Sequence, residues 1–474
     1  MVLGRITDGV ARGVENTVSG VSEALFEPVI RLGVTGLSRA GKTVFITSLV
    51  ANLLDRGRMP QFSASPRIGA AFLQPQPDDT LPRFDYETHL GALTGASPHW
   101  PESTRAISEL RLSLRVQPGG FLGGIWGGLA GPRTVHLDII DYPGEWLLDL
   151  GLMGKTYAQW SEETLTRIDA RTEAAKFMAL ARAEDGALRL EEDRAQGLAR
   201  AFTAYLVAAR AAGWSDCTPG RFLLPGDLAG SPVLTFAPLP KPDQTPRGSL
   251  WREMERRFEA YKSRVVRPFF HDHFARLDRQ IVLMDVLGAI HSGPAALEDL
   301  RRTMAEILTA FRPGANGFLS NLLLGKRVDR ILFAATKADH LHHSQHPRLT
   351  AITEALLRDA RDRAAFAGAQ VQAMSIAALR ATVEELRPYD GAERGFVRGM
   401  VLGSGKQAAF YPGELPQDPA HLLTPARKGA SEWLEADYAV MNFAPARLTL
   451  KPGEGPPHIR LDRAADFLLS DRLG

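Results

Sequence analysis

The sequence predicts an α/β fold in which a mostly parallel sheet is interrupted by a helical insertion. Short apolar runs at residues 31–35, 281–284, 331–335 and 371–374 have the composition of buried strands. Strands that alternate with helices are typical of a parallel sheet. Residues 150–278 differ, because they carry long amphipathic helices and no strand pattern. We therefore expect one sheet whose strands are separated along the chain by this insertion.

Two more strands are expected before the insertion. Residues 107–116 alternate apolar and polar side chains, residues 135–140 are apolar, and the glycine-rich stretch between them predicts a β-hairpin. Residues 57–101 are rich in Pro, Gly, Ser and Asp, which predicts a loop. Within the insertion we expect helices over 157–182, 188–212 and 250–277.

Composition places the chain among globular proteins. Of its 474 residues 45% are hydrophobic and 23% charged, and the net charge of +2 does not favour a nucleic-acid partner. The single cysteine, Cys217, fits a reducing compartment, so we expect a cytoplasmic protein. No apolar run reaches the roughly 18 residues of a transmembrane helix. Residues 1–28 predict an amphipathic helix packed on the α/β domain, and peripheral contact with a membrane is the alternative.

A glycine-rich turn, Gly-Leu-Ser-Arg-Ala-Gly-Lys-Thr at residues 36–43, joins the first strand to a helix. It satisfies the P-loop pattern G-x-x-x-x-G-K-[ST], in which glycines let backbone N–H groups point at phosphate oxygens. Lys42 would neutralise the β- and γ-phosphates, and the Thr43 hydroxyl would ligate Mg²⁺. We therefore predict a P-loop NTPase fold whose nucleotide contacts Gly36, Ser38, Arg39, Ala40, Gly41, Lys42, Thr43 and Val44.

A second phosphate motif, Asp-Tyr-Pro-Gly at residues 141–144, ends the strand at 135–140. An acidic residue at this place holds Mg²⁺ in P-loop NTPases, so Asp141 is a predicted metal ligand. The N–H of Gly144 can meet the γ-phosphate, whose loss would release the loop. Without the P-loop before it, the same motif would indicate only a common turn.

A base-binding motif is expected at residues 336–339, Thr-Lys-Ala-Asp, which resemble the [NT]-K-x-D motif of GTPases. The Asp339 carboxylate would accept from N1–H and the 2-amino group of guanine, a donor pair that adenine lacks. A second loop follows the next strand, with Ile376 where alanine is usual. The predicted base contacts are Thr336, Lys337, Asp339, Ser375 and Ile376, with GTP as substrate and GDP as product.

Candidate residues for hydrolysis follow from their positions. Thr104 lies three residues before a strand, where a switch I threonine would contact Mg²⁺ and the γ-phosphate, and Ser103 is its rival. Glu145 follows D-x-x-G, where many GTPases have a glutamine that orients water. Arg39 is either a built-in cation for the phosphates or a solvent-facing loop residue. The predicted catalytic set is Lys42, Arg39, Glu145 and Thr104, with slow intrinsic turnover.

Through these motifs the sequence resembles the YcjX-like family of bacterial stress-associated P-loop NTPases. The resemblance is carried by residues 32–43, 107–112, 138–146, 336–339 and 411–414, and it extends over nearly the whole chain. It implies a GTP-binding, GTP-hydrolysing protein with an extra helical region and a link to stress. The resemblance does not decide whether the base is guanine or adenine, since family members have also been labelled ATPases.

The leading hypothesis is a stress-linked regulatory GTPase with an unknown protein effector. The insertion follows the D-x-x-G loop (switch II) directly, so nucleotide state would reach it through this loop. The alternatives are an ATP-driven remodelling ATPase and a nucleotide-locked scaffold with negligible turnover. Four histidines, His340, His342, His343 and His346, have no acidic or cysteine partner after Asp339 in the sequence, which favours a solvated loop over a metal site.

The length exceeds the roughly 250–300 residues that one core organises, so more than one structural unit is expected. The predicted parts are the N-terminal amphipathic helix (1–28), the nucleotide-binding domain in two pieces (29–149 and 279–390), the helical insertion domain (150–278), and a C-terminal extension packed on the nucleotide domain (391–474).

Overall fold

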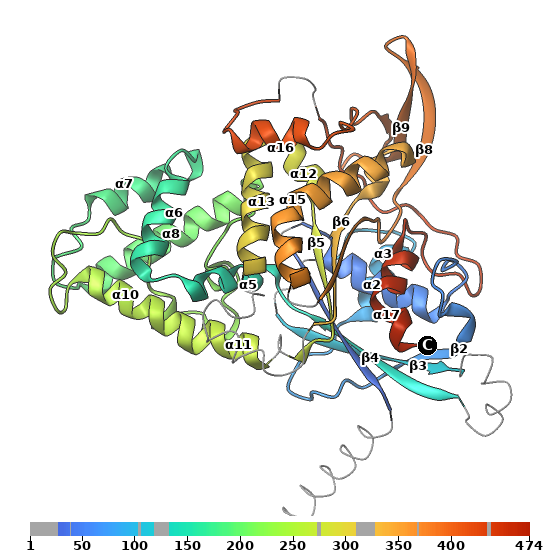
Figure 1. Cartoon of the computed structure of the whole chain (residues 1–474), viewed down its shortest axis with the longest axis horizontal. Helices are drawn as coiled ribbons and strands as arrows, with labels where there is room; N and C mark the ends of the chain where they lie inside the picture. Colours follow the sequence, from blue (N-terminus) through green and yellow to red (C-terminus); the bar gives the residue numbers. More distant parts are fainter. Residues whose placement is uncertain are drawn as a thin grey trace, which may run out of the picture.

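The computed structural model contains a seven-stranded sheet with the strand order β2-β3-β4-β1-β5-β6-β7 (Figure 1). It describes residues 27–37, 39–102, 106–117, 132–272, 276–309, 328–366, 369–433 and 438–474. The strands are β1 (Val29–Gly36), β2 (Ile68–Gln74), β3 (Ser108–Val116), β4 (Arg133–Asp141), β5 (Arg279–Met284), β6 (Arg330–Ala335) and β7 (Gln370–Ser375). All neighbouring pairs from β4 to β7 are parallel, while β2–β3 and β3–β4 are antiparallel. The predicted α/β fold with a mostly parallel sheet is confirmed.

The centre of the sheet is β1, where the strand order changes direction. Val34 of β1 lies in register with Asp141 of β4 on one side and Ile281 of β5 on the other. Because these strands are parallel, their carboxyl ends meet at one edge of the sheet. Ligands of open α/β sheets bind at this edge, beside the strand where the order reverses.

Helices connect the strands and fill the segment between β4 and β5. They are α2 (Lys42–Leu54), α3 (Tyr86–Thr94), α5 (Gly144–Leu148), α6 (Tyr157–Ile168), α7 (Ala175–Ala183), α8 (Glu192–Ala212), α9 (Gly220–Leu223), α10 (Leu250–Tyr261), α11 (Arg267–Asp272), α12 (Val286–His291), α13 (Pro294–Thr309), α15 (His346–Phe366), α16 (Ala420–Arg427) and α17 (Leu461–Leu469). In Figure 1, α6, α7, α8 and α10 form a lobe beside the sheet.

The prediction of a loop over residues 57–101 is wrong, because this segment contains β2 and α3. β2 is an edge strand, and after Ile68 its side chains are half-buried or exposed, so it shows no alternating pattern. α3 is capped by Asp85, but of its nine residues only Tyr86, Ala92 and Leu93 are buried. Both elements therefore give a weak periodic signal.

The helix predicted over 157–182 is broken into α6 and α7. Arg171 takes an extended conformation between them, and its buried guanidinium donates to Asp299 Oδ1 at 2.6 Å. Ile168 and Phe177, on either side of the break, enter the same core. The apolar period therefore continues across the break, and Arg171 makes a tertiary ion pair at this point. The helix predicted over 250–277 is likewise α10, a π-helical turn at Lys262–Val266, and α11.

Two hydrophobic cores cover the two faces of the sheet. Along β6, Ile331 and Phe333 face one core and Leu332 and Ala334 the other, as expected for a strand buried on both sides. One core is shared with α2 and α17, and the other with α12, α13, α15 and the insertion helices. The fully buried Arg279 joins α17 to the sheet, because it donates to the Leu468 carbonyl at 2.9 Å.

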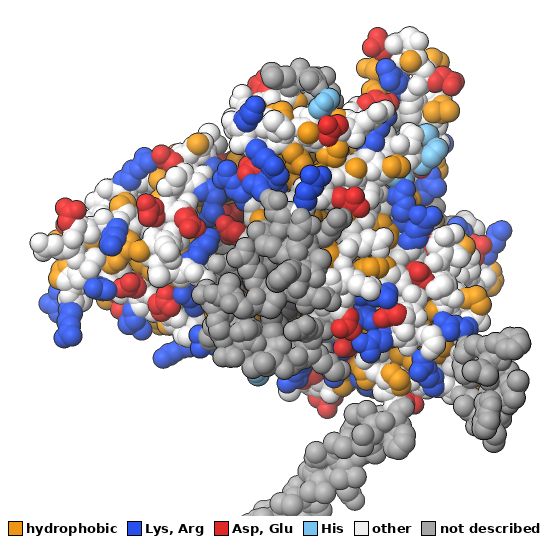
Figure 2. All heavy atoms as spheres, viewed as in Figure 1, with side chains coloured by type: hydrophobic (Ala, Val, Ile, Leu, Met, Phe, Trp, Pro, Cys, Tyr) orange, Lys and Arg blue, Asp and Glu red, His pale blue; other side chains and the backbone are white. Residues whose placement is uncertain are grey.

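The insertion has an aromatic interior. Trp160 of α6 stacks on Phe258 of α10 with ring centroids 5.0 Å apart, and Tyr157 and Phe236 complete the cluster. These residues belong to the same continuous core as Phe333 of β6. The insertion is therefore packed against one face of the sheet. On the surface shown in Figure 2, acidic and basic side chains are interspersed over the described residues.

A small antiparallel sheet of β8 (Thr382–Tyr389), β9 (Ala392–Met400) and β10 (Gln407–Phe410) follows β7, and its β8–β9 hairpin projects from the molecule (Figure 1). The two-residue turn is Asp390-Gly391, with φ values of 50° and 73°, which suits a type I′ turn. Residues 1–26 of the predicted amphipathic helix lie outside the described residues. Among the described helices, none has the length and apolar character that crossing a membrane needs.

Candidate functional site

The P-loop joins β1 to α2 at the carboxyl edge of the sheet. Arg39 and Gly41 have φ values of 65° and 76°, so the loop curls twice through left-handed conformations before α2 begins at Lys42. Gly36 leaves little room, because a Cβ atom there would lie 3.0 Å from Leu283 Cβ. The curled loop leads directly into the positive end of the α2 dipole, which suits an anion. Ser38 lies outside the described residues.

Lys42 forms an ion pair with Asp141, the last residue of β4. The two side chains are 11% and 1% exposed. They meet because β4 pairs directly with β1 and Asp141 lies in register with Val34. The cation predicted for the phosphates and the carboxylate predicted for the metal are thus adjacent. Thr43, the next residue, adds a hydroxyl in the first turn of α2, and Mg²⁺ prefers oxygen donors of this kind.

The D-x-x-G glycine touches the P-loop. A Cβ atom at Gly144 would lie 1.8 Å from the Gly36 carbonyl oxygen, so only glycine fits. Gly144 is also the first residue of α5. Switch II therefore starts in direct contact with the phosphate loop.

The insertion holds the residues that follow Gly144. The Trp146 ring lies edge-on to Phe269 at 5.4 Å, and the Arg221 guanidinium lies 3.3 Å from its centroid. Asp149 accepts from the Gly220 N–H at 2.8 Å and the Tyr261 hydroxyl at 2.5 Å. Burial raises the pKa of the Asp149 carboxyl to about 7, although these hydrogen bonds lower it. Switch II is thus enclosed by insertion residues.

The carboxyl end of α8 contacts two of the predicted catalytic residues. Arg39 Nη2 donates to the Ala211 carbonyl at 3.3 Å, and Arg210 Nη1 lies 3.3 Å from Glu145 Oε1. Together with Trp214, Arg210 and Glu145 line a small cleft. Arg39 is exposed, and its hydrogen bond connects the P-loop to the last turn of the insertion's longest helix.

At the base end, Thr336 and Lys337 continue from β6. The Thr336 N–H and hydroxyl both donate to the Met284 carbonyl, at 2.9 and 3.2 Å. Lys337 has a φ of 60° and forms an ion pair with Asp285. Asp285 is also the N-cap of α12, since it accepts from the Gly288 N–H at 2.9 Å. The second motif lysine is therefore paired with the end of the neighbouring strand, as Lys42 is.

Asp339 is buried, with 4% of its surface exposed. Its Oδ2 accepts from the Ala381 N–H at 2.9 Å, and its carbonyl accepts from the Thr382 hydroxyl. Among the described residues Oδ1 has no hydrogen-bond partner. One carboxylate oxygen is thus fixed by the chain at the start of β8, and the other remains for a ligand.

The loop after β7 lies beside the guanine motif, because the Ala338 N–H donates to the Ile376 carbonyl at 3.0 Å. The Ser375 hydroxyl is occupied by Thr350 Oγ1 at 2.9 Å and Arg460 at 2.7 Å. The Ile376 side chain is fully buried. The base contacts predicted for Ser375 and Ile376 stay predictions.

Sheet topology places the two ends of the site a nucleotide's length apart. β5 separates the P-loop strand from β6, and two strand spacings amount to roughly 10 Å. A nucleotide with its phosphates on the P-loop would thus bring its base to the β6 and β7 ends. Thr104 and its rival Ser103 lie outside the described residues.

Sequence reasoning missed the partners that come from distant segments. Arg210 and Ala211 on α8 contact the phosphate loops, while Asp285 and Ala381 contact the base motif. No local motif marks these residues, because each lies on an element whose packing brings it to the site.

Comparison with known proteins agrees with the motifs. The model of the YcjX-like family, DUF463, matches residues 30–473. A relative from Escherichia coli K12 described as "Ras-like GTPase YcjX" is 36% identical over 460 residues, covering 94% of this chain and 96% of the relative. A relative of the same description from Shewanella oneidensis MR-1 is 34% identical over 471 residues, covering 94% of each chain.

Proposed function

Because the chain belongs to the YcjX-like family, we propose that it binds GTP with Mg²⁺, hydrolyses GTP, and couples its nucleotide state to the helical insertion through switch II. The description of both relatives as Ras-like GTPases supports guanine as the base. A stress-linked regulatory role with a protein effector rests on the family resemblance. A cytoplasmic location is part of the proposal, since a single cysteine fits a reducing compartment.

In this proposal the phosphates break the Lys42–Asp141 pair. Lys42 would turn to the β- and γ-phosphates, and Asp141 and Thr43 would hold Mg²⁺, directly or through water. Bound Mg²⁺ would neutralise charge on the β- and γ-phosphate oxygens. The Gly144 N–H, beside Gly36, is placed to meet the γ-phosphate. In the nucleotide-free protein, the Lys42–Asp141 ion pair balances the charges of both side chains.

The observation that carries the coupling is the double contact of α8 with Arg39 and Glu145. A γ-phosphate near Gly144 would lie close to both Arg39 and Glu145, the two residues that the end of α8 contacts. Arg210 also balances the charge of Glu145, whose carboxylate would otherwise be repelled by the phosphates. We assign Arg210 the role of a cation supplied within the chain, comparable to an arginine finger in cis.

The test is single-turnover GTP hydrolysis by Arg210→Ala. We expect a rate at least about tenfold lower with GTP affinity changed less than about threefold, as for a group that acts in the transition state. Arg200→Ala is the matched control, since Arg200 lies on the same helix with an exposed side chain that contacts only Gln196 among the described residues. An unchanged rate in Arg210→Ala, or an equal loss in the control, would refute the assignment.

The ATP-driven remodelling enzyme remains the second candidate. It needs no contact between Asp339 and guanine, whereas the buried Asp339 with one carboxylate oxygen held by Ala381 favours a dedicated base reader. Competition of GTP and ATP for one fluorescent nucleotide decides between the two. The same single-turnover assay separates both from a nucleotide-locked scaffold, which would bind GTP without hydrolysing it.

A further inference from the structure

The histidine cluster after Asp339 is not the solvated loop that the sequence predicts. His340, His342 and His346 are buried, and His346 Nε2 lies 2.8 Å from the Ala338 carbonyl. His343 alone is exposed. The burial follows from the β8–β9 hairpin and α15, which pack over the segment.

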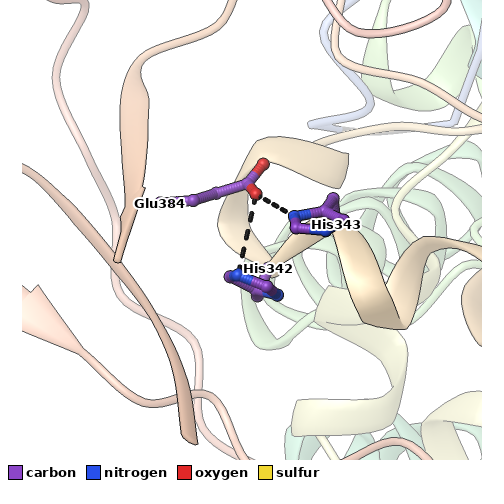
Figure 3. Close-up of side chains that lie close together, drawn as sticks. All are labelled: His342, His343 and Glu384. Carbon is purple, nitrogen blue, oxygen red and sulfur yellow. Dashed lines mark hydrogen bonds and ion pairs between the residues drawn. The ribbon is translucent and has the colours of Figure 1, made fainter. Parts of the chain in front are cut away.

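Tertiary structure supplies the acidic partner that the sequence lacks. Glu384 of β8 reaches the cluster, with Oε2 2.5 Å from His343 Nδ1 and 3.9 Å from His342 Nε2 (Figure 3). In Figure 3 both rings lie on the side of Glu384 to which its carboxylate points. One ligand atom from each of the three residues lies within 4.8 Å of the others. No other group of this kind occurs among the described residues.

The geometry needs only small side-chain adjustments to hold an ion. Zinc bonds of about 2.0–2.2 Å in a tetrahedral site place neighbouring ligand atoms about 3.3–3.6 Å apart. To reach this spacing, the distance between His343 Nδ1 and Glu384 Oε2 would lengthen, and the distance between His342 Nε2 and Glu384 Oε2 would shorten. His343 is 70% exposed, so the fourth position of the ion would face solvent.

Neighbouring groups orient two of the ligands. His342 Nδ1 lies 2.9 Å from Ser344 Oγ and accepts from the Ser344 N–H at 3.4 Å, so this nitrogen faces its own segment and Nε2 faces Glu384. The ring is fixed by β9, because a Cβ atom at Gly395 would lie 2.6 Å from His342 Cβ. Arg380 lies 3.3 Å from Glu384 Oε1, the oxygen that does not face the histidines.

We propose that His342, His343 and Glu384 form a zinc site with the ligand atoms Nε2, Nδ1 and Oε2. Two imidazoles and one carboxylate with an open position are a ligand set that suits Zn²⁺. The ion would link the segment after Asp339 to β8, which already holds Asp339 through Ala381 and Thr382. If the proposed nucleotide site is correct, bound Zn²⁺ stabilises the base-reading position of Asp339 and strengthens guanine nucleotide binding.

The test is a Zn²⁺ titration of the full chain, free of any histidine tag and of nucleotide, against a chromogenic chelator. We expect one Zn²⁺ per chain, and affinity at least about tenfold weaker in His343→Ala and in Glu384→Gln, since even loss of an outer-shell partner costs 10–100-fold. Co²⁺ in place of Zn²⁺ should give the visible absorption of a four-coordinate ion, and both variants should lose it. His271→Ala is the control, because His271 is an exposed histidine beside a carboxylate, Asp272.

Equal Zn²⁺ affinity in all four proteins, or no stoichiometric binding by the unmodified chain, would overturn the site. Far-ultraviolet circular dichroism separates this result from misfolding of a variant. A second arm measures GDP affinity with and without Zn²⁺. Tighter GDP binding with Zn²⁺ in the unmodified chain, absent in His343→Ala, supports the link to Asp339, and no change refutes it. Failure of GDP binding itself would count against the proposed function alone, because the metal titration needs no nucleotide.

Discussion

The phosphate end and the base end of the site each contain a motif lysine paired with an aspartate of a neighbouring strand. Lys42 pairs with Asp141 at the end of β4, and Lys337 pairs with Asp285 just after β5. The first pair is nearly buried, whereas the Lys337 side chain is 29% exposed. Asp285 also caps α12, so the second pair has a structural role that the first lacks. In the proposed function the Lys42–Asp141 pair would open when a nucleotide binds, whereas the Lys337–Asp285 pair would stay in place.

Different parts of the chain surround the phosphate end and the base end of the site. Helices of the insertion contact the phosphate end through Ala211, Arg210 and Arg221. The base end is held by β8, through Ala381 and Thr382, and by the loop after β7. If the nucleotide acts on the insertion, the phosphate end must transmit the change while the base end stays in place.

The largest expected effect distinguishes the two lysines. Lys42→Ala should weaken GTP binding about 100-fold or more, because it removes charge-assisted hydrogen bonds to two phosphates worth about 1.5–3 kcal/mol each. Lys337→Ala should weaken it about tenfold, since only packing against the base and one ion pair are lost. Equilibrium titration with a fluorescent GTP measures both, with circular dichroism as a check on folding. Equal losses would contradict the comparison.

Asp339→Asn should weaken GTP binding about 30- to 100-fold and favour xanthosine triphosphate, because an amide can donate where the carboxylate accepts. The asparagine oxygen can still accept from the Ala381 N–H, so the Tm should change little. Competition of the two nucleotides for one probe measures the exchange. If the variant keeps its preference for GTP, the base is read elsewhere.

Thr43→Ala should raise the Mg²⁺ concentration needed for half-maximal GTP binding about tenfold, the cost of roughly 1.4 kcal/mol for one lost ligand. GDP binding should suffer less, because it lacks the γ-phosphate that shares the ion. Thr43→Ser keeps the hydroxyl and should behave like the unmodified protein. A similar loss in both variants, or for both nucleotides, would argue against a role as metal ligand.

The smallest effect tests how the insertion holds switch II. Because the Asp149 pKa is raised by burial to about 7, the native state binds this proton more tightly than the unfolded chain. The stabilisation is complete below the unfolded pKa of about 4 and is lost as pH rises to about 7. The Tm of the unmodified protein should therefore fall relative to Asp149→Asn between pH 5 and 7.5. Parallel Tm curves for the two proteins would contradict this.

Local sequence determined the nucleotide motifs and the strands that carry them. The P-loop turn, Asp141 and the 336–339 motif each follow an apolar strand, and strand ends can be located because burial on both faces requires a continuous apolar run. The Asp390-Gly391 dipeptide is also a strong local signal for a hairpin turn. The composition of this part of the chain did not predict the β8–β9 hairpin that it joins.

Only the tertiary structure decided which distant side chains complete the site. Arg39 and Ala211 are 172 positions apart, and His343 and Glu384 are 41 positions apart, so no local sequence pattern links either pair. Periodicity reports which face of an element is buried, but the partner across the core depends on how separate elements pack. For the same reason the apolar stripe over 157–182 did not reveal the break between α6 and α7, where Arg171 pairs with Asp299.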